Sequence, residues 1–206
     1  MPSVAGLSAT LTCARVWPGI ILFFIYTGVE VAAGQWTYSL LTEARSVSAP
    51  MAGAAVSAYW GSFTVARVLA AALVPRIGPR VVLRAALMSA PVGGALLWLA
   101  DGPALHVLAL IVLGASLASV YPLVMAETAR RVGDRYALHA VGLQVSAAYL
   151  GAGAIPGGIG VLAGIYGLDV IGPALAMLAM IVLGVHHFTR DSRYSALDAP
   201  LPAART

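Results

Sequence analysis

The sequence predicts an all-α membrane protein with six transmembrane helices. Hydrophobic residues make up 60% of the 206 residues and charged residues only 10%, whereas a soluble domain carries about 25% charged residues. Six apolar runs are each long enough for a helix to cross the hydrocarbon core, which takes roughly 20 residues. The runs are continuous, whereas barrel strands alternate apolar and polar residues over about 10 positions. Helices are therefore expected, and strands are not.

The six helices are expected at residues 17–41, 50–74, 81–100, 104–126, 138–163 and 168–188. An N-terminal segment (1–16) and a polar, Pro- and Ala-rich C-terminal tail (189–206) flank this bundle (17–188). The segments between the runs are short, so no soluble domain is inserted. The chain is therefore expected to form one compact helical bundle that lies mostly within the lipid bilayer.

The runs differ in polarity. Four of them carry large polar or amphipathic side chains: Glu30, Gln35 and Trp36 in the first, Tyr59, Trp60, Thr64 and Arg67 in the second, Tyr121 in the fourth, and Gln144 and Tyr149 in the fifth. The third and sixth runs have almost none. We expect the third and sixth helices to face lipid over much of their surface, and the other four to face protein or a water-filled cavity.

All basic residues are arginines, and the net charge is +4. Ten of the twelve fall in segments that alternating runs place on one side: Arg15, Arg76, Arg80, Arg84, Arg130, Arg131, Arg135, Arg190, Arg193 and Arg205. The positive-inside rule then places both termini in the cytoplasm, with the bundle in the inner (plasma) membrane. The charge is thus a topology signal, and no nucleic-acid partner is expected.

Small residues and prolines mark where helices pack closely or bend. Gly53, Ser57 and Gly61 repeat every fourth residue on the second run, and Gly153 and Gly157 do so on the fifth. Such stripes allow two helix backbones to approach closely. Among the prolines within the runs, Pro156 lies in a glycine-rich stretch, and we expect the helix to break there.

Glu30 lies near the middle of the first run. A carboxyl group at that depth is costly and normally faces the bundle interior. Hydrogen bonding to a substrate, ion binding and protonation are the functional interpretations. The alternative is a protonated acid held by structural hydrogen bonds.

Arg67 lies in the second run, nearer its cytoplasmic end. The helical rise puts it about 10 Å from the level of Glu30 along the membrane normal, so an ion pair requires the arginine to extend toward the centre. We expect Arg67 to act in gating or helix positioning rather than as a substrate ligand.

The remaining candidates are aromatic and amide side chains. Trp36, Tyr59, Trp60, Tyr121 and Tyr149 could line a site for a polar solute such as a sugar, with Gln35 and Gln144 as hydrogen-bonding partners. Their alternative roles are packing in the bundle core and anchoring at the membrane interface.

Enzyme chemistry has little support in the sequence. The lone Cys13 excludes an internal disulfide and is too little for a metal site. His186 and His187 are adjacent, so they do not share a helix face as chelating residues four apart would. The six-helix rhomboid proteases need a Gly-x-Ser-Gly turn, and Leu117 replaces the second glycine after Gly114-Ala115-Ser116. No enzyme activity, metal or cofactor is expected.

Four segments follow one another in a distinctive order: FFIYTGVE (23–30) with GQW (34–36), ARVL (66–69) with PRIGPR (75–80), SVYP (119–122), and GAGAIPG (151–157). Together they resemble the seventh, eighth, tenth and eleventh helices of fucose-permease-like transporters of the major facilitator superfamily. The resemblance covers about residues 17–188. It implies that the chain is the C-terminal, six-helix half of a twelve-helix fold.

The resemblance also implies a function. In that family the first and fourth helices of each half line the cavity, the second and fifth join the halves, and the third and sixth face lipid. The expected activity is transport of a small polar solute, with sugar as the family's suggestion and a proton as a candidate co-substrate, by alternating access. A second six-helix half, from another copy of the chain or a separate polypeptide, would complete the pathway.

The gating loop of the family matches only in part. Arg67, Arg76, Gly78 and Arg80 fit its pattern, but Ala71 and Pro75 replace its glycine and aspartate, and Pro79 interrupts its final basic pair. The main coupling acids of the proton symporters lie in the half that is missing here, so proton symport does not carry over. Two alternatives stay open: a truncated or split transporter fragment that is inactive alone, and a non-transporting membrane interaction protein.

Overall fold

The computed structural model describes residues 5–197, with side chains as far as Phe188, and every regular element in this part of the chain is helical. In chain order the elements are α1 (Leu7–Leu11), α2 (Trp17–Ser39), the π-helical turn η1 (Leu40–Ala44), α3 (Ala49–Ile77), α4 (Pro79–Leu99), α5 (Pro103–Leu117), α6 (Val120–Val132), α7 (Asp134–Tyr166), the 3₁₀ turn η2 (Leu168–Val170) and α8 (Ile171–Leu197). Six helical stretches among them are long and apolar enough to cross a membrane. The predicted six-helix fold class is confirmed.

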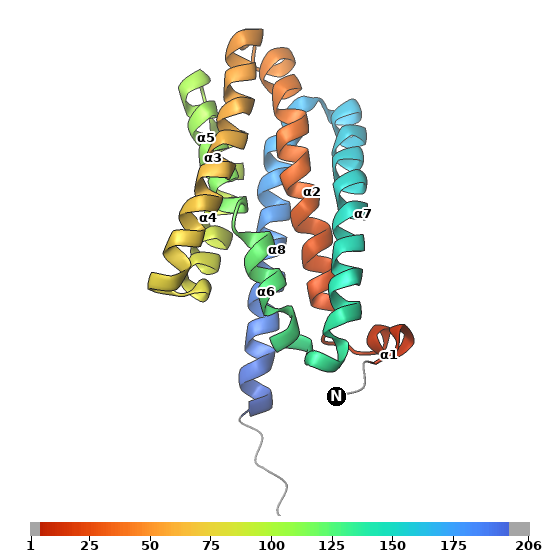
Figure 1. The fold of residues 1–206 in the computed structure, drawn as a ribbon. Helices are drawn as coiled ribbons and strands as arrows, with labels where there is room; N and C mark the ends of the chain where they lie inside the picture. Colours follow the sequence, from red (N-terminus) through yellow and green to blue (C-terminus); the bar gives the residue numbers. More distant parts are fainter. Residues whose placement is uncertain (1–4, 198–206) are drawn as a thin grey trace, which may run out of the picture.

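The spans lie in two groups of three, with α3, α4 and α5 in one and α2, α7 and α8 in the other (Figure 1). Helix α2 packs along α7 and on α8, while α5 packs along α3 and on α4, and α4 lies along α8. The first, second and third spans (α2, α3 and α4) correspond to the fourth, fifth and sixth (α5 with α6, α7 and α8). Under this correspondence the α2–α7 contact matches the α5–α3 contact, and the α2–α8 contact matches the α5–α4 contact. The contacts therefore follow a 3+3 repeat within the six-span bundle.

Two glycines let the main helix pairs approach closely. A Cβ atom added at Gly151 of α7 would lie 1.9 Å from the backbone oxygen of Phe24 in α2. A Cβ atom added at Gly114 of α5 would lie 2.5 Å from the backbone oxygen of Tyr59 in α3. Because any larger residue would push the backbones apart, these glycines set the spacing of the bundle.

The spans differ in how much of them the chain itself buries. About 56% of the most apolar window of the fourth span is buried, against 28% for α7 and 17% for α3. Several glycines on the outer surfaces of α3 and α7 have no atom in reach of an added Cβ: Gly53, Gly61, Gly153, Gly157 and Gly164. Gly160, in contrast, faces the ring of Trp36. Both helices therefore present a narrow, uncovered face.

The predicted position of the broken helix is wrong. Helix α7 continues through Pro156, whose carbonyl accepts a hydrogen bond of 2.9 Å from the Trp36 indole of α2. The break lies instead in the fourth span, which we expected as one helix over 104–126. This span divides into two helices between Leu117 and Val120. Pro122 follows this break, and its ring has no N–H to offer the carbonyl four residues earlier.

The predicted ends of the chain also differ from the structure. Residues 1–16 include the short helix α1, and α8 runs into the predicted tail (189–206) as far as Leu197. Residues 1–4 and 198–206 lie outside the described part of the chain. Helix α6 extends the fourth predicted span to Val132, and α7 begins the fifth span at Asp134.

Replacing Gly151 with alanine tests the close approach of α2 and α7. The added methyl group meets the Phe24 carbonyl, so we expect a loss of about 1–3 kcal/mol of stability, typical of overpacking. The measurement is the thermal unfolding midpoint of the purified protein in mild detergent. Gly142→Ala on the same helix is the control, because nothing lies within 4 Å of its added Cβ. Equal midpoints for the two variants would contradict the proposed spacing.

Candidate functional site

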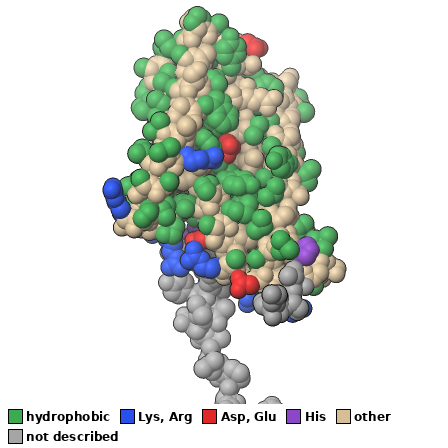
Figure 2. All heavy atoms as spheres, in the orientation of Figure 1, with side chains coloured by type: hydrophobic (Ala, Val, Ile, Leu, Met, Phe, Trp, Pro, Cys, Tyr) green, Lys and Arg blue, Asp and Glu red, His purple; other side chains and the backbone are tan. Residues whose placement is uncertain are grey.

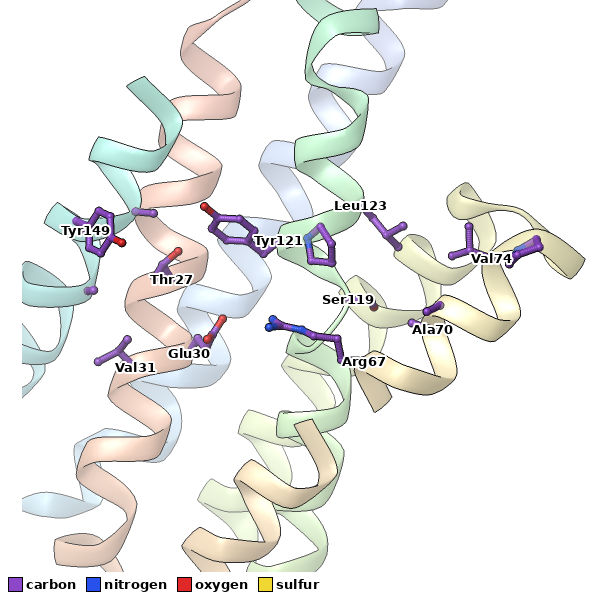
Figure 3. Close-up of a pocket in the computed structure, with 15 residues that line it drawn as sticks. Thr27, Glu30, Val31, Arg67, Ala70, Val74, Ser119, Tyr121, Leu123 and Tyr149 are labelled. Carbon is purple, nitrogen blue, oxygen red and sulfur yellow. The ribbon is translucent and has the colours of Figure 1, made fainter. Parts of the chain in front are cut away.

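A cavity of about 730 Å³ lies between α2, α3, α6 and α7, beside the break in the fourth span. Its polar lining consists of Thr27, Glu30, Arg67, Ser119, Tyr121 and Tyr149, and its remaining walls are alanine, valine, leucine and proline (Figure 3). The lining runs along α3 from Arg67 to Pro75. Arg67 and Tyr149 are both exposed, so the cavity is open on one side of the bundle.

The surface around this opening is largely hydrophobic. Figure 2 shows a basic and an acidic group side by side midway along this face, enclosed by apolar side chains. Most other charged groups on this face gather at its lower end, around α6 and the base of α4. A charged patch at half height in an apolar surface is uncommon in membrane proteins and marks a candidate functional site.

Side chains satisfy two backbone carbonyls at the break in the fourth span. Pro122 cannot donate to the carbonyl of Ala118, and that oxygen instead accepts a 3.0 Å hydrogen bond from Arg67 Nε. The neighbouring carbonyl of Leu117 accepts a 2.9 Å hydrogen bond from the hydroxyl of Tyr26. Unsatisfied backbone groups cost several kcal/mol in lipid, so these two contacts hold the break.

Glu30 is anchored by two tyrosines. Its Oε2 atom is hydrogen-bonded to the hydroxyl of Tyr26, one turn earlier on α2. The hydroxyl of Tyr59 on α3 donates to the backbone oxygen of Glu30 at 2.9 Å. Among the described residues no cation lies within ion-pair distance of this carboxyl group. It therefore keeps hydrogen-bonding capacity toward the cavity.

Arg67 faces Glu30 across the cavity (Figure 3). Its guanidinium carbon lies 4.5 Å from the centre of the Phe63 ring, and its Nε is engaged by Ala118. The cation–π contact and the backbone contact fix the side chain while its terminal nitrogens remain near the cavity. The arginine thus positions the break and supplies a cation to the cavity wall.

Four of the predicted residues come together in this cavity: Glu30, Arg67, Tyr121 and Tyr149. The ring of Tyr121 also packs edge-on against Phe23, with their centroids 4.8 Å apart. Tyr149 is 78% exposed, so it stands at the open side.

The other predicted lining residues lie elsewhere. Tyr59 is fully buried, and Trp60 packs edge-on against it with its indole beside Gly34. Trp36 joins α2 to Pro156, and Gln35 is exposed without lining the cavity. The buried Gln144 accepts a 2.9 Å hydrogen bond from Thr128, which ties α7 to α6. Most of these side chains therefore pack the bundle rather than line its cavity.

The remaining predicted gating residues lie at the junction of α3 and α4. Gly78 alone separates the two helices, and its φ of +86° is a conformation that favours glycine. Arg76 and Arg80 flank this turn and are exposed, and neither forms an ion pair with a residue in the described part of the chain.

Tyr26, Thr27 and Ser119 belong to the site but were not predicted as site residues. Tyr26 lies four residues before Glu30, so helical spacing puts both on one face, and this signal could have been used. The Thr27 hydroxyl is buried in the cavity wall without a hydrogen-bond partner. The role of Ser119 depends on the break, which periodicity does not reveal.

The arrangement suits the binding of a small polar molecule. Among the side chains that the structure describes (residues 5–188), no group of three His, Cys, Asp or Glu is placed to hold a metal ion. What the cavity offers is a carboxyl group, a guanidinium group, three hydroxyl groups and an aromatic ring with a hydroxyl at its mouth. These groups can hydrogen-bond a small polar molecule.

Comparison with known proteins supports the fold. No protein-family model matches the sequence, and no curated protein matches it. A solved structure of FucP, a Major Facilitator Superfamily (MFS) transporter in the outward conformation, matches with a TM-score of 0.73 and 19% sequence identity. The match covers 88% of this chain and 45% of that transporter, so the chain spans about half its length. The chain therefore has the fold of one half of a major-facilitator transporter.

A double-mutant cycle between Arg67 and Pro122 tests how the break is held. Arg67→Met leaves the Ala118 carbonyl without a donor, and we expect a loss of about 1–3 kcal/mol in unfolding free energy. Pro122→Ala restores a backbone N–H that can donate to the same carbonyl, so Arg67→Met should cost less in that background. Arg80→Met, at an exposed position, is the control. An equal cost of Arg67→Met in both backgrounds would show that Arg67 does not serve this carbonyl.

Proposed function

We propose that this chain forms one half of a transporter that moves a small polar solute across the membrane by alternating access. The observation that carries the proposal is the open cavity in which Arg67 faces Glu30, a residue near the middle of α2. Transporters of this class place their substrate site near the bilayer midplane between two repeated units. The likeness to an MFS transporter supports the same use of the fold.

A sugar is the solute class that we propose for the cavity. Carboxylate and guanidinium groups with several hydroxyl groups match the donors and acceptors of a polyhydroxylated molecule. Tyr149 at the mouth and Tyr121 at the break offer ring faces for its apolar side. In this assignment Glu30 and Arg67 bind the solute, and Thr27 and Ser119 complete its hydrogen bonds.

A second six-helix unit is needed to close the pathway. The cavity is open on one side, and α3 and α7 present glycine-lined faces that the chain leaves uncovered. A surface of small residues permits close packing of another helix pair in lipid. We propose that α3 of one unit meets α7 of the other, and that the partner is a second copy of this chain. A separate polypeptide is the alternative partner.

The orientation follows from the arginines. The α3–α4 and α6–α7 junctions, which carry Arg76, Arg80, Arg130 and Arg131, lie at the same end of the bundle (Figure 1). The positive-inside rule places this end in the cytoplasm of a cell whose inner (plasma) membrane holds the protein, with both termini on that side. Arg76, Gly78 and Arg80 would then gate the cytoplasmic end of the pathway, with Arg67 linking the gate to the cavity.

Uptake measurements test the transport proposal. The full chain is reconstituted in lipid vesicles and supplied with a panel of radiolabelled monosaccharides. Glu30→Gln removes the charge but keeps the size, and we expect the uptake of any transported sugar to fall about tenfold or more, as for loss of one charge-assisted hydrogen bond. Glu43→Gln, an exposed carboxyl group in η1, should keep wild-type uptake.

Three results would count against transport as proposed. Unchanged uptake by Glu30→Gln removes this residue from the mechanism. No uptake of any sugar by a chain shown to form the paired assembly favours the non-transporting interpretation. No uptake by an unpaired chain favours the inactive fragment, which agrees with a match to only 45% of the related transporter.

Disulfide trapping tests the pairing. Ser57 and Gly157 are exposed and lie about two turns from the same end of α3 and α7, so cysteines there should meet across the proposed interface. In a Cys13→Ser background, Ser57→Cys with Gly157→Cys should give covalent dimers under mild oxidation. Met88→Cys with Met177→Cys, on the outer faces of α4 and α8, should not. Monomers alone from the first pair would contradict the self-pairing.

A further inference from the structure

The hydroxyl of Tyr26 has two acceptors and one proton. Its oxygen lies within hydrogen-bond distance of both Glu30 Oε2 and the carbonyl oxygen of Leu117. A phenolic hydroxyl can donate one hydrogen bond, and a backbone carbonyl can only accept. Both contacts are therefore hydrogen bonds at the same time only if Glu30 carries a proton and donates it to Tyr26, which then donates to Leu117.

Loss of the Glu30 proton reverses this relay. An ionised carboxylate only accepts, and it is the stronger acceptor of the two. The Tyr26 proton then turns to Glu30, and the Leu117 carbonyl is left without a donor. The proton that Glu30 gives up leaves to water in the cavity that this residue lines, while Tyr26 keeps its own.

The same change acts on the second carbonyl of the break. The titratable and charged groups around Glu30 are few: Tyr26 faces it from α2, Tyr59 and Arg67 from α3, Tyr121 from α6 and Tyr149 from α7. Arg67 is the cation among them, and its Nε holds the Ala118 carbonyl. A negative charge on Glu30 attracts Arg67 across the cavity and away from that oxygen.

We propose that Glu30 is a proton-binding site whose occupancy controls the break between α5 and α6, through Tyr26 on Leu117 and Arg67 on Ala118. With the proton bound, both carbonyls have donors and the break is held. With the proton released, both donors are drawn toward Glu30 and the break loosens. α6, which carries Tyr121 into the cavity, is thereby coupled to a proton.

The purpose of this proton site rests on the proposed function, since a proton that moves a cavity wall can be coupled to transport. The experiment that tests the proton site does not depend on the proposed function. The relay lies within one chain, so it can be measured without a solute and without knowing the second half. The transport proposal and the proton relay can therefore be disproved independently of each other.

Backbone amide exchange at the break is the measurement. The full chain in lipid vesicles is exchanged into deuterium at a series of pH values. The amide exchange rate of the segment 118–123 in the wild type is then divided by the rate of the same segment in the Glu30→Gln variant at the same pH. This ratio cancels the intrinsic pH dependence of exchange. We expect it to be near one at low pH and to rise about fivefold at high pH, as for loss of one net hydrogen bond.

Two tyrosine variants separate the relay from general packing. Tyr26→Phe cannot donate to Leu117, so its exchange should already be faster than that of the wild type at low pH, even though Glu30 is present. Tyr59→Phe is the matched control: its hydroxyl contacts only the backbone of Glu30, so the pH dependence of the wild type should persist. Infrared spectra should show a protonated carboxyl band at low pH that is missing in Glu30→Gln.

Several results would overturn the proposal. A wild-type ratio that does not change with pH means that the Glu30 proton does not reach the break. Exchange in Tyr26→Phe that is as slow as in the wild type at low pH excludes the tyrosine as a link. Loss of the pH dependence in Tyr59→Phe would assign the effect to packing around Glu30 rather than to the relay. Absence of a Glu30-dependent carboxyl band excludes the proton site itself.

Discussion

The break in the fourth span depends on one constraint, that a backbone carbonyl in a bilayer must find a donor. Pro122 takes the helical donor away from Ala118, and the structure replaces it with Arg67 from α3. Tyr26 from α2 serves the carbonyl of Leu117 in the same way. The two side chains that hold the break are therefore also the two that flank Glu30. Satisfying these carbonyls brings a guanidinium group and a tyrosine to the side of Glu30.

The bundle supplies the frame for this arrangement. Gly151 and Gly114 let α7 approach α2 and let α5 approach α3, in two contacts that the repeat relates to each other. These close pairs bring the carboxyl group of the first span and the broken fourth span to opposite walls of one cavity. The second and fifth spans keep an uncovered face, against which the proposed second unit would pack.

Much of the fold could be predicted from the sequence, because spanning a bilayer imposes length and polarity on each helix. The six spans, the intramembrane carboxyl group and its cavity neighbours Arg67, Tyr121 and Tyr149 followed from these constraints. The predicted helix break was misplaced because a proline removes a backbone N–H donor wherever it lies in a helix. Only three-dimensional contacts decide whether another group takes the place of that donor. Buried aromatic residues such as Tyr59 and Trp36 look alike in sequence whether they line a cavity or pack a core. Tyr26 was missed for the converse reason, since its role comes from Leu117, far away in sequence.

The most direct measurement is a density map of the full chain in lipid that resolves the backbone of residues 114–124 and the side chains around it. We expect a helix interrupted at Ala118 and Ser119, with Arg67 Nε on the Ala118 carbonyl and the Tyr26 hydroxyl between Glu30 and the Leu117 carbonyl. A continuous helix through this segment, with Arg67 and Tyr26 directed elsewhere, would contradict the proposal that the two carbonyls organise the site.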